Sequence, residues 1–229
     1  MCGIIGYIGA RNVQNVVVKG LKRLEYRGYD SAGIAVLDDS LKVTKCKGKV
    51  AKLEAMLSKT NEADIGIGHT RWATHGEPND VNSHPHTSTN GKIAVVHNGI
   101  IENYAALKVQ LQSQGHVFYS DTDTEIIAKL IEQFYKNPDV LSLEKAVQLA
   151  TQQVNGTYGL AVLHEDFPDL MVVARRGSPL LLGVGNDEMM VASDASAVAE
   201  YTDKVVYLDD NETAVIRRNS YEVQDTSYV

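Results

Sequence analysis

The 229-residue sequence predicts an α+β fold in which two antiparallel sheets lie face to face between outer helices, a four-layer α/β/β/α sandwich. Two observations lead to this prediction. Short segments rich in Val, Ile and Tyr recur along the chain and are separated by tight turns, as in antiparallel sheets. The longer helical segments are grouped in the middle of the chain, which argues against the regular strand and helix alternation of a parallel sheet.

About a dozen segments have the length and the apolar or alternating pattern of strands. Many end at Gly, Asn or Asp, which favour turns. In chain order the expected strands are 3–8, 31–37, 41–47, 65–69, 93–97, 158–163, 170–174, 180–184, 189–192, 205–208, 214–217 and 221–224.

Helical periodicity is clearest in three segments. Residues 13–26 place Val13, Val17 and Leu24 on one face, and residues 103–112 show a similar pattern. A third helix is expected to begin at Thr122, because Thr122-Asp123-Thr124-Glu125 fits a capping box and an apolar stripe follows it. Shorter helices are expected at 51–58, 143–151 and 194–201.

Composition limits the classes of function. The chain carries 22 basic and 29 acidic residues, a net charge of −7, so nucleic acid is not an expected partner. It has no apolar run of about 18 residues, so no membrane span is expected. Two cysteines, Cys2 and Cys46, predict a reducing, cytoplasmic setting rather than a disulfide framework. No linker-like or repeated segment divides residues 1–229, so we expect a single domain.

Cys2 stands directly before the first expected strand. Chain ends usually fray, so an end that enters the core suggests a function for its first side chain. We expect Met1 to be removed, which would give Cys2 a free α-amine beside its thiol. With pKa values of about 8 and about 8.5, the two groups exchange a proton near neutral pH, so Cys2 is predicted to be a nucleophile with its own base. The alternative is a small apolar residue that only packs.

The segment 68–76, Gly-His-Thr-Arg-Trp-Ala-Thr-His-Gly, follows an expected strand and has the composition of a ligand-binding loop. The guanidinium of Arg71 can pair with a carboxylate through two parallel hydrogen bonds, which suits the α-carboxylate of an amino acid. Trp72 would then cover the ligand and exclude water. The alternative is an arginine paired with a surface acid and a tryptophan that fills a gap.

Asn98-Gly99 is a dipeptide typical of hairpins, yet a helical pattern rather than a second strand follows it. We therefore expect the strand to end here and to expose its backbone donors. A side-chain amide beside a glycine N–H can hold an oxyanion, and one such donor lowers a barrier by about 3 to 4 kcal/mol. Asn98 and Gly99 are thus predicted to form an oxyanion hole.

Asp123 lies in the first turn of its expected helix, where the helix dipole favours a carboxylate. It is a candidate for holding the α-ammonium of an amino acid, and the alternative is a purely helix-stabilising role. The histidines, His84 and His86 among them, fit none of the familiar zinc spacings. We expect neither a metal nor another cofactor, although a metal-binding or regulatory module stays open as a second hypothesis.

Together, four segments resemble the glutamine amidotransferases that use an N-terminal cysteine as nucleophile. In chain order they are Cys2-Gly3-Ile4-Ile5-Gly6, Arg71-Trp72-Ala73-Thr74-His75-Gly76, His97-Asn98-Gly99-Ile100-Ile101-Glu102-Asn103 and Thr122-Asp123-Thr124-Glu125. The resemblance spans essentially the whole chain and implies an N-terminal nucleophile hydrolase fold. Segments 24–33 and 81–86 are similar to the glutaminase half of the enzymes that aminate fructose-6-phosphate. Relatives that act on phosphoribosyl pyrophosphate or aspartate usually differ around the first of these.

The resemblance implies a role for each matching residue. Cys2 would attack the side-chain amide of L-glutamine, and Asn98 and Gly99 would stabilise the tetrahedral intermediate. Arg71 would bind the α-carboxylate of glutamine and Asp123 its α-ammonium. The other implied residues are Trp72, Thr74 and His75 in a loop that closes over glutamine, Gly99 and His84 close to the ligand, and Arg27 in support of the nucleophile's surroundings.

The resembling enzymes have a second, larger half that isomerises the sugar and receives ammonia through an internal channel. No such half is present in this sequence, so residues 1–229 are expected to be an excised glutaminase domain, and a truncated product is the alternative. Its implied partner is the sugar isomerase domain of a full-length enzyme, expected to be a homodimer. An N-terminal nucleophile hydrolase that acts on another amide stays open.

Overall fold

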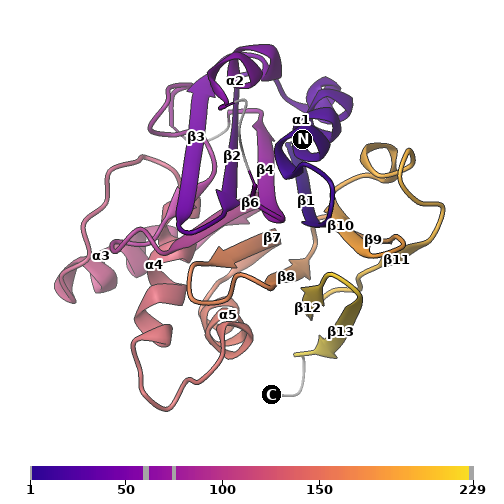
Figure 1. Cartoon of the computed structure of the whole chain (residues 1–229). Helices are drawn as coiled ribbons and strands as arrows, with labels where there is room; N and C mark the ends of the chain where they lie inside the picture. Colours follow the sequence, from indigo (N-terminus) through magenta and orange to yellow (C-terminus); the bar gives the residue numbers. More distant parts are fainter. Residues whose placement is uncertain (1, 59–61, 74–75, 227–229) are drawn as a thin grey trace.

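The computed structural model describes residues 2–58, 62–73 and 76–226, and these residues form a four-layer sandwich. A seven-stranded and a six-stranded antiparallel sheet lie face to face in the middle. Helices α1 and α2 cover one outer side, and α3, α4 and α5 cover the opposite side (Figure 1). The predicted α/β/β/α architecture is therefore confirmed.

The seven-stranded sheet places the first strand of the chain near its centre. The strand order is β11-β9-β10-β1-β4-β2-β3, so β1 is paired on both sides. The residue that precedes β1 thus stands beside the core of the molecule. The strands are β1 (Gly3–Gly9), β2 (Ser31–Leu37), β3 (Leu41–Lys47), β4 (Ile65–Arg71), β9 (Leu181–Val184), β10 (Glu188–Ala192) and β11 (Val205–Tyr207).

The six-stranded sheet has the order β13-β12-β8-β7-β6-β5. Its strands are β5 (His86–Thr87), β6 (Ile93–Ile101), β7 (Gly156–His164), β8 (Leu170–Arg176), β12 (Glu212–Arg217) and β13 (Ser220–Asp225). Strand β5 was not predicted, because two residues are too short to show an alternating pattern.

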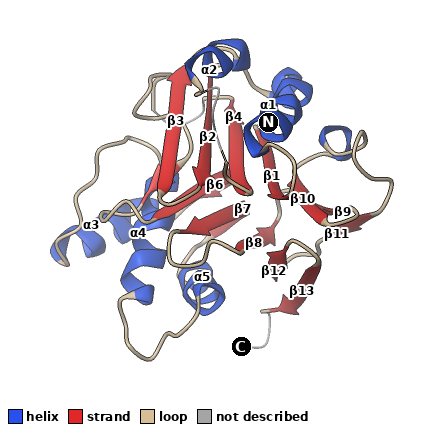
Figure 2. Cartoon of the chain, in the orientation of Figure 1, coloured by secondary structure: helices blue, strands red, loops and turns tan. Residues whose placement is uncertain are grey.

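Five α-helices are present in the described part of the chain (Figure 2). They are α1 (Val13–Leu24), α2 (Val50–Met56), α3 (Tyr104–Ser113), α4 (Thr124–Tyr135) and α5 (Leu143–Gln152). The helix predicted over 194–201 is only a 3-10 turn at Ala195–Ala197, and the end of the segment 13–26 is a second one at Glu25–Arg27. None of the described helices is both long and apolar enough to span a membrane.

The predicted capping box at Thr122 is wrong. Helix α4 begins at Thr124 with Asp123 as its N-cap, and the Asp123 side chain makes no capping hydrogen bond. The Glu125 carboxylate accepts hydrogen bonds from the backbone N–H groups of Tyr119 and Ser120 instead. The preceding loop therefore folds back onto Glu125, and the Asp123 carboxylate remains available for another partner.

Three buried apolar clusters correspond to the three interfaces between the four layers. One lies between α1, α2 and the seven-stranded sheet, one between the two sheets, and one between α3, α4, α5 and the six-stranded sheet. Alternate residues of β4, Ile65 and Ile67, belong to the middle cluster, as do Ala94 and Val96 of β6. Continuing each alternation by one step leads to His69 on β4 and Asn98 on β6, so the inner core becomes polar at one end.

Candidate active site

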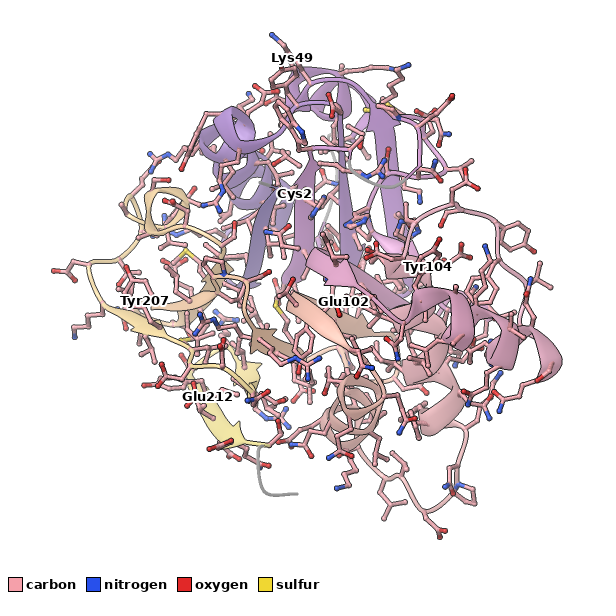
Figure 3. The ribbon with its side chains drawn as sticks, turned by 180° about the vertical axis from the view of Figure 1, so that it is seen from behind. Cys2, Lys49, Glu102, Tyr104, Tyr207 and Glu212 are labelled. Carbon is pink, nitrogen blue, oxygen red and sulfur yellow. The ribbon has the colours of Figure 1, made fainter. Side chains whose placement is uncertain are left out.

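Cys2 is partly buried and directly precedes β1; it is labelled in the upper central part of the view from behind (Figure 3). The backbone N–H of Trp72 donates a hydrogen bond to Cys2 Sγ at 3.2 Å, and Sγ lies 3.6 Å from the Trp72 carbonyl oxygen. These contacts join the N-terminal thiol to the residue that follows β4. Cys2, for which the sequence predicts a function, is therefore held in a defined position.

The surroundings of Cys2 keep its thiol protonated. Burial raises the pKa of the Cys2 thiol, while the Trp72 N–H and the positive charge of Arg71 act in the opposite direction. The thiolate is the nucleophilic form of cysteine. A reaction at this sulfur near neutral pH therefore needs a base that removes the proton.

Strand β6 does not end at Asn98-Gly99, which corrects the prediction. It continues to Ile101, and Gly99 pairs with Tyr158 of β7. Gly99 has a φ of 137°, and a Cβ at this position would lie 2.0 Å from the carbonyl oxygen of Thr157. Glycine therefore allows the strand to pass through a conformation that other residues rarely adopt, and the ladder to β7 is maintained.

Asn98 connects β6 to Cys2. Its Nδ2 donates a hydrogen bond to the Cys2 backbone carbonyl at 3.0 Å. A side-chain amide carries two N–H donors. The amide is thus placed beside Cys2 with donor groups directed toward it.

A cavity of about 230 Å³ opens beside Cys2. Its volume is below the roughly 300 to 1,000 Å³ of pockets that hold drug-sized ligands, so it suits a ligand the size of an amino acid. Five predicted site residues line its wall: Cys2, Arg27, Trp72, Asn98 and Gly99. The other lining residues, which the sequence did not indicate, are Ile100, Thr157, Ser178 and Pro179.

Arg71 and Asp123 are both buried, and neither lines this cavity in the described structure. Arg71 ends β4, and its guanidinium donates to the Gly76 carbonyl at 3.2 Å. Burial lowers the pKa of Arg71, and the carboxylates of Asp123 and Asp30 counteract this effect, as does Cys2 in its thiolate form. The structure therefore brings the predicted cation and anion within electrostatic reach of each other.

The backbone holds Asp123 and the loop after β4 in place. The Asp123 carboxylate accepts a hydrogen bond from the Ile101 N–H at 2.9 Å. The Asp30 carboxylate, which the sequence analysis did not single out, accepts one from the Ala73 N–H at 2.9 Å. Thr74 and His75, the next two predicted ligand residues, lie outside the described part of the chain.

Arg27 is a wall residue of the cavity. It is buried, and its guanidinium contacts the Asp194 carboxylate at 3.1 Å and the Ser193 carbonyl at 3.4 Å. These bonds fix the wall to the segment after β10. The supporting role predicted for Arg27 stays a prediction.

His84 lies behind the site in a stack of imidazoles. Its ring centroid is 4.0 Å from that of His69 and 4.9 Å from that of His86. Burial lowers the pKa of all three histidines, so they are neutral near pH 7. The rings pack against one another. Within the described ranges, no three or more His, Cys, Asp or Glu side chains are arranged so that they could hold a metal ion.

His69 is a further residue that the sequence analysis missed. Its Nε2 lies 3.0 Å from Asn98 Oδ1 and 3.0 Å from the His97 carbonyl oxygen. The signal was the alternation Ile65, Ile67, His69, which places an imidazole on a face that is otherwise apolar.

Comparison with known proteins identifies a family that matches most of the chain. The family described as "Glutamine amidotransferase domain" matches residues 54–229. Glutamine--fructose-6-phosphate aminotransferase [isomerizing] of Chlorobaculum tepidum is 54% identical over 228 residues, and the protein of that name from Thermococcus kodakarensis is 53% identical over 226. Both alignments cover 98% of this chain, which spans 37% of the length of either relative.

Solved structures share the fold. Glutamine phosphoribosylpyrophosphate amidotransferase from B. subtilis matches the whole chain with a TM-score of 0.85 at 26% identity, and the match covers 50% of that protein. A glutamine aminotransferase class-II domain protein from Silicibacter pomeroyi matches 99% of the chain and 100% of that protein with a TM-score of 0.65, at 14% identity. The chain belongs to the glutamine amidotransferase domain family.

Proposed function

We propose that this chain hydrolyses the side-chain amide of L-glutamine to glutamate and ammonia, with Cys2 as the nucleophile. One observation carries the proposal. Cys2, Asn98 and Gly99, three residues that matched the family's segments, line a single cavity, and Asn98 Nδ2 bonds the Cys2 carbonyl. Family membership supports glutamine as the substrate.

The first half of the proposed reaction forms a thioester. Removal of Met1 gives Cys2 an α-amine, which takes the thiol proton as Sγ attacks the amide carbon of glutamine. The raised pKa of the thiol makes this base necessary. The negative charge that develops on the amide oxygen is stabilised by the Asn98 Nδ2–H and the Gly99 N–H. The C–N bond then breaks, and the protonated amine gives its proton to the leaving ammonia.

The second half releases glutamate. Water attacks the thioester carbon and loses a proton to the Cys2 amine, and the same oxyanion donors stabilise the second tetrahedral intermediate. The C–S bond breaks, the sulfur takes up the proton, and the free thiol is restored. No external oxidant, reductant or metal is required.

Glutamine is held at its amino-acid end in this proposal. Arg71 pairs with the α-carboxylate and Asp123 with the α-ammonium, which explains why two opposite charges are buried near one cavity. Trp72, Thr74 and His75 belong to the segment that closes over the ligand, and Gly99 lies against it. His84 acts from behind the site, through its packing on His69.

The acceptor of the ammonia is proposed to be fructose-6-phosphate, bound by the sugar isomerase domain of a longer protein. Curated relatives named for that acceptor are 54% and 53% identical over nearly the whole chain, against 26% for the phosphoribosylpyrophosphate enzyme. We further propose that residues 1–229 are one glutaminase domain, that the full-length enzyme is a homodimer, and that it works in the cytoplasm, where thiols remain reduced.

The nucleophile is tested with Cys2→Ala. Glutamate release should fall by a factor of at least about 10⁴, because removal of a nucleophile removes the covalent route. Glutamine should still bind, as measured by calorimetry. Cys46→Ala is the matched control, since Cys46 is buried in β3, and it should retain full activity. Activity in Cys2→Ala would contradict the proposal.

The acceptor is tested with the full-length protein. Glutamine-dependent formation of glucosamine-6-phosphate from fructose-6-phosphate supports the assignment. Amination of phosphoribosyl pyrophosphate in its place contradicts it, and leaves the glutaminase proposal intact.

A further inference from the structure

We propose that His69 is a positioning residue for the reaction, which holds the Asn98 side-chain amide in the one orientation that can stabilise an oxyanion. The inference rests on the proposed glutaminase function, because it assigns His69 a role through Asn98. It concerns a residue that lies outside the cavity wall and touches neither the nucleophile nor the ligand.

The hydrogen-bond partners of His69 determine its tautomer. Nε2 lies 3.0 Å from two oxygens, the His97 carbonyl and Asn98 Oδ1. A carbonyl oxygen and an amide oxygen only accept hydrogen bonds. Nε2 must therefore carry the proton, and it donates to both oxygens at once.

The same bonds determine which way the Asn98 amide points. Its Oδ1 faces the His69 N–H, and its Nδ2 donates to the Cys2 carbonyl at 3.0 Å. A rotation of the amide by 180° would set Nδ2 against the His69 N–H and Oδ1 against the Cys2 carbonyl. Both contacts would become repulsive, so His69 and Cys2 together exclude the rotated amide.

The orientation matters because of the charge that develops in the reaction. An amide N–H directed at a forming oxyanion stabilises it, whereas an amide oxygen in the same place repels it. In the proposed reaction the sulfur of Cys2 gains and loses a substituent. His69 does not take part in bond changes and gives the amide a fixed reference throughout.

The surroundings of His69 keep this donor constant. Burial lowers the pKa of His69 to about 3, and the ring packs against His84 at 4.0 Å. The imidazole is 1% exposed, and its Nδ1 has no hydrogen-bond partner among the described residues. Across the pH range of ordinary assays His69 is therefore neutral, with one N–H, and that N–H is directed at β6.

The place of His69 on β4 allows its side chain to contact β6 of the opposite sheet. It projects from β4 of one sheet to the backbone and side chain of β6 in the other. Its bond to the His97 carbonyl fixes the ring relative to the strand that carries Asn98. The amide is consequently oriented by the opposite sheet rather than by a mobile loop.

A double-mutant cycle tests the inference. His69→Phe should lower kcat for glutamate release by between about 10-fold and 100-fold, part of the effect of losing an oxyanion donor. KM should stay within about 3-fold, because ground-state binding does not involve the amide. In an Asn98→Ala background His69→Phe should have no further effect on kcat. His69→Gln, which keeps a side-chain N–H, should recover activity relative to His69→Phe.

Controls separate positioning from a general loss of structure. His164→Phe removes another buried imidazole, at the end of β7, and should leave kcat unchanged. If His69→Phe does not fold, nitrogen NMR of histidine-labelled wild-type protein gives the answer without a variant: the inference requires the Nε2–H tautomer of His69 from pH 5 to 8.

The outcomes are distinguishable from a failure of the proposed function. An inactive Cys2→Ala together with an equal effect of His69→Phe in both backgrounds would overturn the inference alone. So would an unchanged kcat in His69→Phe, full activity in Asn98→Ala, or an Nδ1–H tautomer. An active Cys2→Ala would overturn the glutaminase proposal itself.

Discussion

At the scale of single residues, the site is built around contacts to Cys2 from two directions. The backbone N–H of Trp72 bonds its sulfur, and the side chain of Asn98 bonds its carbonyl. The first contact comes from the end of β4 and the second from β6. Both strands are internal to their sheets, so Cys2 is positioned by strands that pair on both sides.

Arg71 offers the sharpest residue-scale prediction. Arg71→Lys should raise the KM for glutamine by between about 10-fold and 100-fold. Lysine cannot form the two parallel bonds of a guanidinium, and the lost charged hydrogen bond is worth about 1.5 to 3 kcal/mol. The kcat at saturating glutamine should change less. Steady-state kinetics measure both constants.

The matched control for this prediction is Arg218→Lys. Arg218 pairs with Asp187, which lies in the turn between β9 and β10. This turn is next to the far end of β1 from Cys2, because Glu188 pairs with Gly9. This variant should leave KM unchanged. An Arg71→Lys enzyme with normal KM would remove Arg71 from the proposed binding site.

At the scale of elements, β6 is the strand on which the site depends. It carries Asn98 and Gly99, its other face packs on α4, and it remains paired with β7 through Gly99. His97 of the same strand lies 2.9 Å from the hydroxyl of Thr124, at the start of α4. A change in this strand should therefore affect stability and catalysis together.

Gly99→Ala tests this coupling. The positive φ alone costs about 1 to 3 kcal/mol for a residue other than glycine, and the new Cβ would also have to displace the Thr157 carbonyl. We expect a clear fall in the urea midpoint and in kcat. Gly91→Ala is the control, because Gly91 has a φ of 76° and nothing within 4 Å of a Cβ. Gly91→Ala should lose only the stability that the positive φ costs, and its kcat should stay unchanged. Equal falls in the urea midpoint and in kcat for the two variants would contradict the role given to β6.

At the scale of the whole molecule, the candidate active site lies at the end of the middle apolar cluster, where His69 of β4 reaches across to β6 of the other sheet. His69, His84, His86 and His97 are buried, and burial lowers the pKa of each. His69 follows Ile65 and Ile67 on the inner face of β4, whereas His97 contacts Thr124 of α4 on the outer side of β6. Burial therefore penalises the charged form of these rings, and the folded protein favours them uncharged.

A pH dependence of stability follows. In the unfolded chain a histidine titrates near pH 6.5, whereas in the folded protein the pKa of His69 is about 3. Between these values the unfolded state binds more protons, so the free energy of unfolding falls as the pH is lowered below 6.5. Each such histidine contributes about 1.4 kcal/mol per pH unit.

Urea denaturation between pH 7 and pH 5 measures this effect. The free energy of unfolding should be level above pH 6.5 and decline below it, and His69→Gln should reduce the slope by the share of one histidine. A slope that does not change in His69→Gln would show that folding does not lower the pKa of His69.

Much of this organisation could be predicted from the sequence, and the exceptions have physical causes. Strand and helix patterns identified nearly all elements, because most have one buried face. The 3-10 turn at Ala195–Ala197 and the two-residue strand β5 were misjudged, since short segments carry too little periodicity. The course of β6 through Gly99 depends on pairing with β7, and the partner of Glu125 depends on a loop that folds back. His69 was missed because its role arises only where two sheets meet.

The central claim is that the sulfur of Cys2 attacks glutamine. Its most direct test is labelling with an electrophilic diazoketone analogue of glutamine, followed by peptide mass spectrometry. The account predicts one adduct per chain, on Cys2 and not on Cys46, formed in proportion to the loss of glutaminase activity and prevented by glutamate. Loss of activity with the adduct on any other residue, or full labelling of Cys2 without loss of activity, would contradict it.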